Sequence, residues 1–413
     1  VFSREKESIP AWNKFLQGYY DASGISSDSF DQAVRVNVGG DVALTDEMRD
    51  KGIRLRDVAD GTTAMADFVA QFSDEELCTI VRGEGMNSPR VTPGTAGAIG
   101  GVSDALQRYG LPAACCSDGP SGIRMDCGTV AFAMPNGTCL AATFNEGLSE
   151  ELYSMEGLEL RKNHVDTLLG PGINIHRHPL NGRNFEYFSE DPLLTGKMAC
   201  AQLRGMHRWG VTGTIKHFAT NNQEHRRHFV ESVVSERALR EIYLRGFEIA
   251  VKEGHPRSIM SSYNLVNGTY ANENKHLLME ILRGEWGFKG HITTDGFAKT
   301  STYKTHYMEM ITAGVDFVCL DPGETAAAVT AAIDGGDGYI MQQLRRATKA
   351  NVYAASRSIS ANGLSSNSIV VNIVPWWEMV LLVVTAICGI TFIGCTAACV
   401  VMTYGKKNKK VEG

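Results

Sequence analysis

Residues 290–296, GHITTDG, decide the fold of this 413-residue chain and raise the question of its function. The β-branched run at 292–294 is typical of a buried strand, yet it ends at the charged residue Asp295, followed by a glycine. An Asp-Gly pair is common in turns, where the carboxylate accepts hydrogen bonds from nearby backbone groups. Whether Asp295 is a turn residue or a functional group depends on how the other strands end.

Four more short apolar runs are predicted strands: TLLGPGINI (167–175), GVTGTIKHF (210–218), PRSIMSSYN (256–264) and AGVDFVCL (313–320). Amphipathic stretches at 235–254 and 274–288 lie between them and predict helices. Alternating strands and helices over residues 51–357 predict an α/β fold with a parallel sheet. At this length a closed (β/α)8 TIM-like barrel is favoured over an open, doubly wound sheet.

The stretch 235–254 carries the clearest helical signals. Ser235 is a good N-cap and Gly254 a good stop. Helical spacing predicts a single apolar face made of Leu239, Ile242, Tyr243, Phe247 and Ala250.

The composition changes on both sides of the barrel. Residues 1–50 are polar and predict an extension, whereas the Ser- and Asn-rich segment from 358 predicts a linker over 358–375. Residues 379–404 carry no charge, so a transmembrane helix is expected over 376–405. The lysines of the basic tail, 406–413, predict a cytoplasmic C-terminus and an extracellular barrel, with membrane lipid as a partner.

Composition and spacing also bear on cofactors and partners. The net charge is −6, so nucleic acid is not an expected partner. The histidine pairs 176/178 and 225/228 have no third ligand at metal spacing, and the chain shows no glycine-rich phosphate loop. We therefore expect no metal and no cofactor.

Hydrogen-bonding side chains follow several of the predicted strands. His176, Lys216 with His217, Tyr263 with Asn264, and Asp295 all come at strand ends. In a barrel the carboxyl ends of the strands build the active site, so these groups are expected to converge. Many such groups around one carboxylate suit a polyhydroxylated substrate. An ionised Asp295 beside a sugar is able to attack the anomeric carbon and form a glycosyl-enzyme.

The same region resembles glycoside hydrolase family 3, the β-glucosidase type. Over residues 54–355 the motifs SDGPSGIR (117–124), GRNFEYFSEDP (182–192), KHFATNNQEHRR (216–227), IMSSYNLVNG (259–268) and LRGEWGFKGHITTDG (282–296) occur in family order. The resemblance implies hydrolysis of terminal β-D-glucosides, with β-xylosides next. It implies that Asp295 is the catalytic nucleophile. It implies that the substrate-binding residues are Asp118, Arg124, Arg183, Lys216, His217, Met260 and Tyr263.

Two departures from the family pattern bear on activity. The family usually has tryptophan after the nucleophile, where this chain has Gly296. KHFATNN replaces the KHFPGHG of the N-acetylglucosaminidase branch, which disfavours an amino-sugar substrate.

The general acid/base that a retaining glycosidase needs has no motif in this chain. In the resembling β-glucosidases it comes from an α/β sandwich domain. The linker and apolar tail resemble members in which that domain precedes the barrel. The start at Val1 then suits the C-terminal part of a longer protein. If a carboxyl of this chain serves instead, Glu224 and Glu309 are the first candidates. The alternative function is a carbohydrate-binding or scaffold barrel with weakened catalysis.

Overall fold

The computed structural model describes residues 50–86, 88–296, 307–318, 330–331, 334, 338–361 and 376–408. The chain divides into two units, Val1–Ser366 and Asn367–Gly413, and each is described by itself. The predicted N-terminal extension, apart from Asp50, lies outside the described residues, as do residues 362–375 and 409–413.

The first unit is built on a six-stranded sheet in the order β1-β2-β3-β4-β6-β9. These strands are β1 (Gly97–Gly100), β2 (Ala113–Asp118), β3 (Thr167–Leu169), β4 (Thr212–Phe218), β6 (Ser258–Ser261) and β9 (His291–Thr293). From β2 to β9 every neighbouring pair is parallel, with Leu168 opposite Gly213 and Ile259 opposite Ile292. Their carboxyl ends therefore meet at one rim.

The sheet closes on itself through residues outside these strands. Thr293 at the end of β9 forms a parallel bridge with Phe317. The next residue, Val318, donates its N–H to the carbonyl of Val81 at 3.0 Å. Glu84 then pairs with Ala98 of β1. The TIM-like α/β fold is thus confirmed.

The expectation of eight parallel strands is wrong in one respect, because β1 runs antiparallel to β2. The chain reverses at Gly100, where φ is +82°. A Cβ on Gly101 would lie 2.0 Å from the carbonyl oxygen of Leu111, so only glycine permits this close turn. Within the described residues, the predicted strand at 313–320 contributes a single bridge rather than a ladder.

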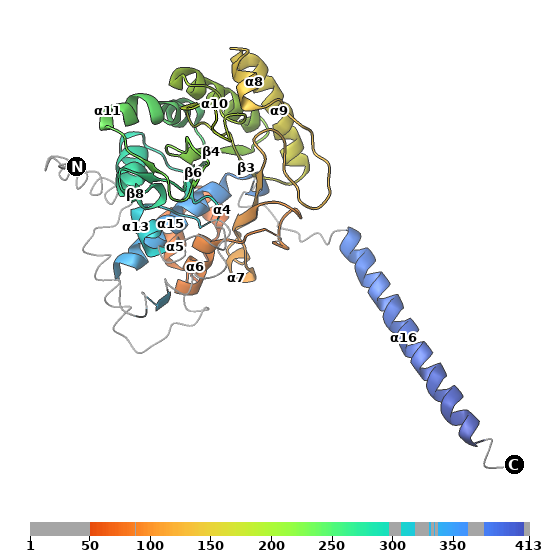
Figure 1. Cartoon of the computed structure of the whole chain (residues 1–413). Coiled ribbons are helices and arrows are strands. Elements are labelled where there is room, and N and C mark those ends of the chain that lie inside the picture. Colours follow the sequence, from red (N-terminus) through yellow and green to blue (C-terminus); the bar gives the residue numbers. More distant parts are fainter. Residues whose placement is uncertain are drawn as a thin grey trace. The chain divides into compact units, whose positions relative to one another are not determined.

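Helices cover the outside of this sheet (Figure 1). The α-helices are α4 (Leu55–Ala59), α5 (Met65–Ala70), α6 (Asp74–Arg82), α7 (Asp104–Gln107), α8 (Gly137–Ala141), α9 (Glu146–Lys162), α10 (Pro192–His207), α11 (Glu236–Ala238), α12 (Arg245–Ile249), α13 (Tyr307–Ala313) and α15 (Gly338–Ser356). The π- and 3-10 segments are η1 (Leu239–Tyr243), η2 (Ala250–Gly254), η3 (Ala271–Glu273), η4 (His276–Glu285) and η6 (Ile359–Ala361). A small second sheet, β5 (Glu231–Ser232), β7 (Leu265–Val266) and β8 (Thr269–Tyr270), ties the loop after β4 to the loop after β6.

The predicted helix at 235–254 forms, with one shift of its buried face. Ser235 caps it by accepting a hydrogen bond from the N–H of Ala238 at 3.3 Å. Ile242 is nevertheless 41% exposed, while Leu244 is buried. The N–H of Leu244 bonds to the carbonyl of Leu239 at 2.8 Å, five residues back, and the extra residue in this π-turn rotates the face. The helix ends as predicted at Gly254, followed by left-handed His255.

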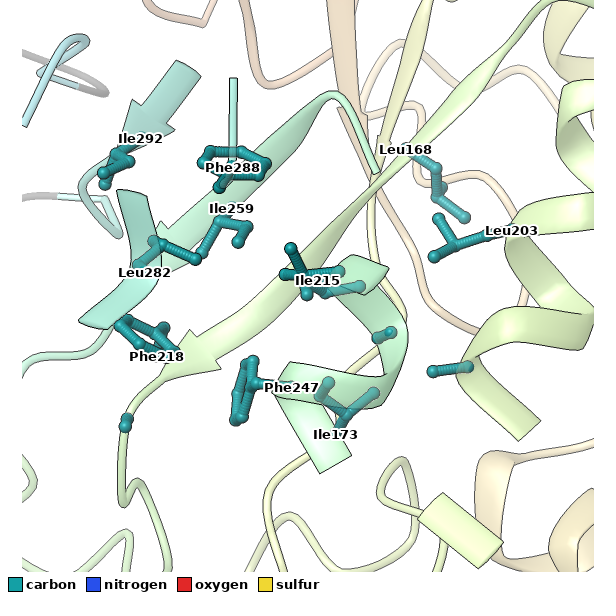
Figure 2. Packing of buried hydrophobic residues seen from close by; sticks show 14 of the residues in the cluster. Leu168, Ile173, Leu203, Ile215, Phe218, Phe247, Ile259, Leu282, Phe288 and Ile292 are labelled. Carbon is teal, nitrogen blue, oxygen red and sulfur yellow. The ribbon is translucent and has the colours of Figure 1, made fainter. Parts of the chain in front are cut away.

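The main core lies between the strands and the outer helices (Figure 2). Phe218 of β4 and Phe247 of α12 meet edge to face with ring centroids 5.1 Å apart. Each fully buried side chain of this kind stabilises the fold by roughly 1.5–3 kcal/mol. Ile215 belongs to this core, and because strand side chains alternate, its neighbour Lys216 faces the barrel interior.

The barrel continues past the predicted boundary at 357. The N–H of Ser360 donates to Asp166 Oδ1 at 2.8 Å, and its hydroxyl donates to Oδ2 at 3.0 Å. Asp166 also accepts from the N–H of Cys115 in β2 at 2.7 Å. Residues up to Ala361, which is buried, therefore belong to the barrel rather than to the linker.

The second unit contains α16 (Trp376–Asn408). Within the described residues it is the one helix long and apolar enough to cross a membrane, over Met379–Met402. The hydroxyls of Thr385, Thr391 and Thr396 each donate to the carbonyl four residues earlier at 2.8 Å. The threonine hydroxyls of this apolar segment are thus hydrogen-bonded within the helix.

Candidate active site

One pocket of about 420 Å³ opens at the carboxyl ends of the strands. The structure brings all eight residues predicted for the site to its walls, namely Asp118, Arg124, Arg183, Lys216, His217, Met260, Tyr263 and Asp295. They come from β2, β4, β6 and the loops after β2, β3, β6 and β9. The strand-end rule therefore predicted that these side chains share one pocket, and their roles stay predictions.

An ion pair between a buried lysine and a partly exposed aspartate lies inside the pocket. Lys216 of β4, with a side chain only 4% exposed, donates from Nζ to Asp118 Oδ1 at 2.8 Å. Asp118 is the last residue of β2. Burial raises the pKa of Asp118, but the charge and hydrogen bond of Lys216 outweigh it, so the pKa lies below its ordinary value. Asp118 is therefore ionised and is able to accept hydrogen bonds inside the pocket.

Arg183 adds a second cation from the loop after β3. Its Nη2 donates to Glu186 Oε1 at 2.6 Å, which holds the guanidinium in the pocket wall. Burial lowers the pKa of Arg183, but acidic neighbours, Asp295 among them, raise it overall above its ordinary value. Arg183 thus stays charged near Asp295.

Asp295 follows β9 by two residues and is held from two sides. The N–H of Gly296 donates to Asp295 Oδ1 at 2.7 Å, so the turn interpretation of the Asp-Gly pair is partly correct. Oδ2 lies 3.7 Å from Nε2 of His217. The Tyr263 hydroxyl donates to the carbonyl of Gly296, which fixes the backbone beside the carboxylate. The side chain is 19% exposed, so the carboxylate is accessible from the pocket.

His217 is fully buried in the wall behind Asp295. Burial lowers the pKa of its imidazole well below the ordinary value, and the positive charges of Arg183 and Lys216 lower it further. The ring is therefore neutral and acts through hydrogen bonds rather than through charge.

The remaining walls are aromatic, apolar and cationic. Met260 of β6 packs in a buried cluster with Leu169 and Phe317. The guanidinium of Arg227 lies 4.9 Å from the ring centroid of Tyr263. Arg227 lines the pocket but was missed, because it lies within the loop after β4 and not at a strand end. The KHFATNNQEHRR motif, which it ends, was the available signal.

Arg124 occupies the rim of the pocket. Its side chain is 61% exposed and pairs with Asp126 at 3.0 Å. It therefore faces the entrance rather than the pair formed by Lys216 and Asp118.

Neither of the two candidate general acids within this chain, Glu224 and Glu309, lines the pocket. Glu224 accepts from Asn221 at 3.1 Å and from Arg227 at 3.2 Å, and is not among the residues lining the pocket. Glu309 lies on the exposed side of α13 and does not line it either. Across the described residues, no three His, Cys, Asp or Glu side chains are grouped to hold a metal ion.

Residues 48–350 match the glycosyl hydrolase family 3 N-terminal domain. The chain belongs to glycosyl hydrolase family 3. This family 3 chain is 51% identical over 380 residues to a β-glucosidase of Ruminococcus albus, covering 89% of the chain and 39% of that relative. It is 42% identical over 262 residues to β-glucosidase A of Butyrivibrio fibrisolvens, covering 63% and 30%.

Solved structures agree with this assignment. A β-glucosidase of Paenibacillus barengoltzii matches with a TM-score of 0.71 and 47% identity, over 80% of this chain and 37% of that one. β-Glucosidase 3B of Thermotoga neapolitana, solved with glucose, matches with a TM-score of 0.66 and 36% identity, over 73% and 43%. The family 3 chain thus spans about two fifths of the length of these relatives.

Proposed function

We propose that this family 3 chain carries the nucleophile part of a retaining β-glucosidase site and acts on terminal β-D-glucosyl residues. The observation that carries the proposal is the arrangement around Asp295. A partly exposed carboxylate shares one pocket with an ionised acceptor, Asp118, and with the donors Lys216, Arg183 and His217. The solved relative with bound glucose supports a glucosyl ligand, and β-xylosides are the second candidate substrate.

In the proposed reaction Asp295 attacks the anomeric carbon and displaces the aglycone oxygen, which takes a proton from the acid/base, and a glycosyl-enzyme forms. Water then gives one proton to the same acid/base as its oxygen attacks the same carbon, the ester bond to Asp295 breaks, and glucose leaves. The charged and neutral donors around Asp295 orient the sugar hydroxyls.

We assign the acid/base to a residue outside the described barrel. Among the described residues, the other pocket-lining carboxylates are Asp118 and Asp126, and each is paired with a cation. Glu224 is bound by Arg227 and Asn221. A general acid needs a carboxyl that can hand a proton to the aglycone oxygen, and each of these carboxylates is instead engaged by a cation or an amide. An upstream α/β sandwich domain, as the family resemblance implies, is the proposed source.

We further propose that α16 anchors the barrel to a membrane, with the barrel outside the cell and the lysine-rich tail inside. The apolar length of the Met379–Met402 segment, whose hydroxyls are hydrogen-bonded within the helix, supports this arrangement. The lysines after the segment support the proposed orientation.

Because the acid/base is assigned outside the described barrel, two substrates that differ in their need for an acid test the proposed function directly. The chain is mixed with dinitrophenyl β-glucoside, whose leaving group departs without protonation, and with cellobiose, whose leaving group requires it. We expect a burst of dinitrophenolate followed by slow turnover, acceleration by azide, and very slow cellobiose hydrolysis. Fast cellobiose hydrolysis would place the acid within this chain. Saturable glucose binding without any burst would favour the alternative, a catalytically weakened carbohydrate-binding barrel, which the glycine at 296 favours.

A further inference from the structure

A line of buried hydrogen bonds ends at the ring nitrogen of His217 that faces away from Asp295. The hydroxyl of Tyr187 lies 3.2 Å from His217 Nδ1. Asn221 Nδ2 lies 3.0 Å from the same hydroxyl and 3.1 Å from Glu224 Oε1. Tyr187, His217 and Asn221 are all buried, so each polar atom in this line needs a partner within the protein.

The direction of each hydrogen bond follows from Glu224. Its carboxylate oxygens accept from Arg227 at 3.2 Å and from Asn221 at 3.1 Å, so Asn221 presents its amide nitrogen to Glu224. The same amide nitrogen then donates to the Tyr187 oxygen. The Tyr187 hydroxyl proton is left for its other neighbour among the described residues, which is His217 Nδ1.

This direction selects one tautomer of the neutral His217 ring. With Nδ1 accepting from Tyr187, the ring proton lies on Nε2, the nitrogen 3.7 Å from Asp295 Oδ2. That separation is too long for a hydrogen bond, so with respect to the described residues the Nε2–H remains available to a ligand.

The opposite tautomer is worse for three reasons. Its Nδ1–H meets two oxygens that already accept a hydrogen bond: the Tyr187 hydroxyl at 3.2 Å, which accepts from Asn221, and Asn174 Oδ1 at 3.3 Å, which accepts from the backbone N–H of His217 at 2.8 Å. It leaves the Tyr187 proton without an acceptor among the described residues. It also turns a ring lone pair towards the carboxylate of Asp295.

We propose that Tyr187 is a positioning residue that fixes His217 as its Nε2–H tautomer, so that His217 offers a hydrogen-bond donor to a sugar hydroxyl beside Asp295. Asn221 and Glu224 orient the Tyr187 hydroxyl. The part that concerns the sugar rests on the proposed function, whereas the tautomer does not.

The tautomer is measured directly by long-range proton–nitrogen NMR on the full chain in detergent, labelled with ¹⁵N-histidine. The His217 signals are assigned by their loss in His217→Asn. We expect a protonated Nε2 in the wild type and a shift towards protonated Nδ1 in Tyr187→Phe, which removes only the hydroxyl. Tyr109→Phe, which removes another buried tyrosine hydroxyl, one that contacts Arg108 and Glu76, is the matched control and should leave the His217 signals unchanged.

A protonated Nδ1 in the wild type, or an unchanged tautomer in a folded Tyr187→Phe, overturns the proposal. The wild-type spectrum decides the tautomer even if the variant does not fold.

The consequence for the ligand is read separately by glucose titration. We expect the glucose Kd of Tyr187→Phe to rise by about tenfold, the effect of losing one well-placed hydrogen bond. A shifted tautomer with an unchanged Kd overturns the role of Tyr187 in sugar binding. The predicted tautomer in a wild type that binds no glucose would instead contradict the proposed function.

Discussion

Lys216 Nζ and Asp118 Oδ1 lie 2.8 Å apart, although they are 98 positions apart in the chain and β3 separates their strands. The contact requires both side chains to face the barrel interior. It places one buried cation and one ionised acceptor at the same wall of the pocket.

Replacing Lys216 by methionine tests this pair. Methionine keeps most of the volume and removes the charge, and Asp118, whose side chain is 38% exposed, keeps some hydration. We therefore expect a loss of about 1–2 kcal/mol in unfolding free energy and a loss of more than about tenfold in glucose affinity. Calorimetric titration and urea unfolding measure both quantities.

Lys197→Met is the matched control, since Lys197 pairs with Glu253 at the surface at 2.5 Å. Surface pairs contribute about 0–1 kcal/mol, and this one lies outside the pocket. Equal glucose affinities for Lys216→Met and Lys197→Met would show that Lys216 does not bind the sugar.

His291 makes stability depend on pH. It is buried in β9, its Nε2 lies 3.0 Å from Ser258 Oγ, and burial lowers the pKa of its imidazole to about 3. The unfolded chain, with a histidine pKa near about 6.5, binds this proton more readily. The contribution of His291 is therefore complete above pH 6.5 and is lost as the pH falls from 6.5 towards 3.

Between pH 8 and pH 5 this one group accounts for a loss of about 2 kcal/mol in unfolding free energy. Urea unfolding of the wild type and of His291→Gln at both pH values measures it. The variant should lose about 2 kcal/mol less than the wild type over this range. Parallel losses in the two proteins would show that His291 is accessible to protons in the folded state.

Two truncations test the end of the barrel and the anchor together. A chain ending at Ala361 keeps the contact of Ser360 with Asp166, and one ending at Arg357 loses it. Both lack α16 and are expected in the supernatant after membrane sedimentation. The shorter chain should be less stable by about 1–3 kcal/mol, because a buried carboxylate loses its partners.

Sedimentation of either truncated chain with membranes would show that another surface holds the barrel there. Equal unfolding free energies for the two truncated chains would place the end of the barrel at residue 357, as predicted from the sequence.

The strand pattern was enough to predict the TIM-like fold and the position of the pocket, because side chains at the carboxyl ends of parallel strands must meet at one rim. It did not predict the reversed β1, which depends on a close approach of Gly101 to the Leu111 carbonyl. Helical spacing also did not predict that Ile242 is exposed, because one π-turn adds a residue and rotates the buried face of the helix.

The residues missed at the site share one property. Arg227, Tyr187 and Asn221 lie inside loops, where the chain's path depends on tertiary contacts and no periodicity applies. Asp295, Lys216 and His217 were predicted to share one pocket because they follow or end strands.

The central claim is that Asp295 is the nucleophile, and covalent trapping tests it most directly. The full chain is incubated with dinitrophenyl 2-deoxy-2-fluoro-β-glucoside, whose activated aglycone needs no acid. The fluorine slows release of the glycosyl-enzyme, which mass spectrometry of peptides then locates. The account predicts one fluoroglucosyl group on Asp295. Asp295→Asn should remain unlabelled, keep its fold and glucose binding, and turn over dinitrophenyl β-glucoside slower by several powers of ten, about 10³-fold or more. A label on another residue, or no label on a wild-type chain that binds glucose, would contradict the account.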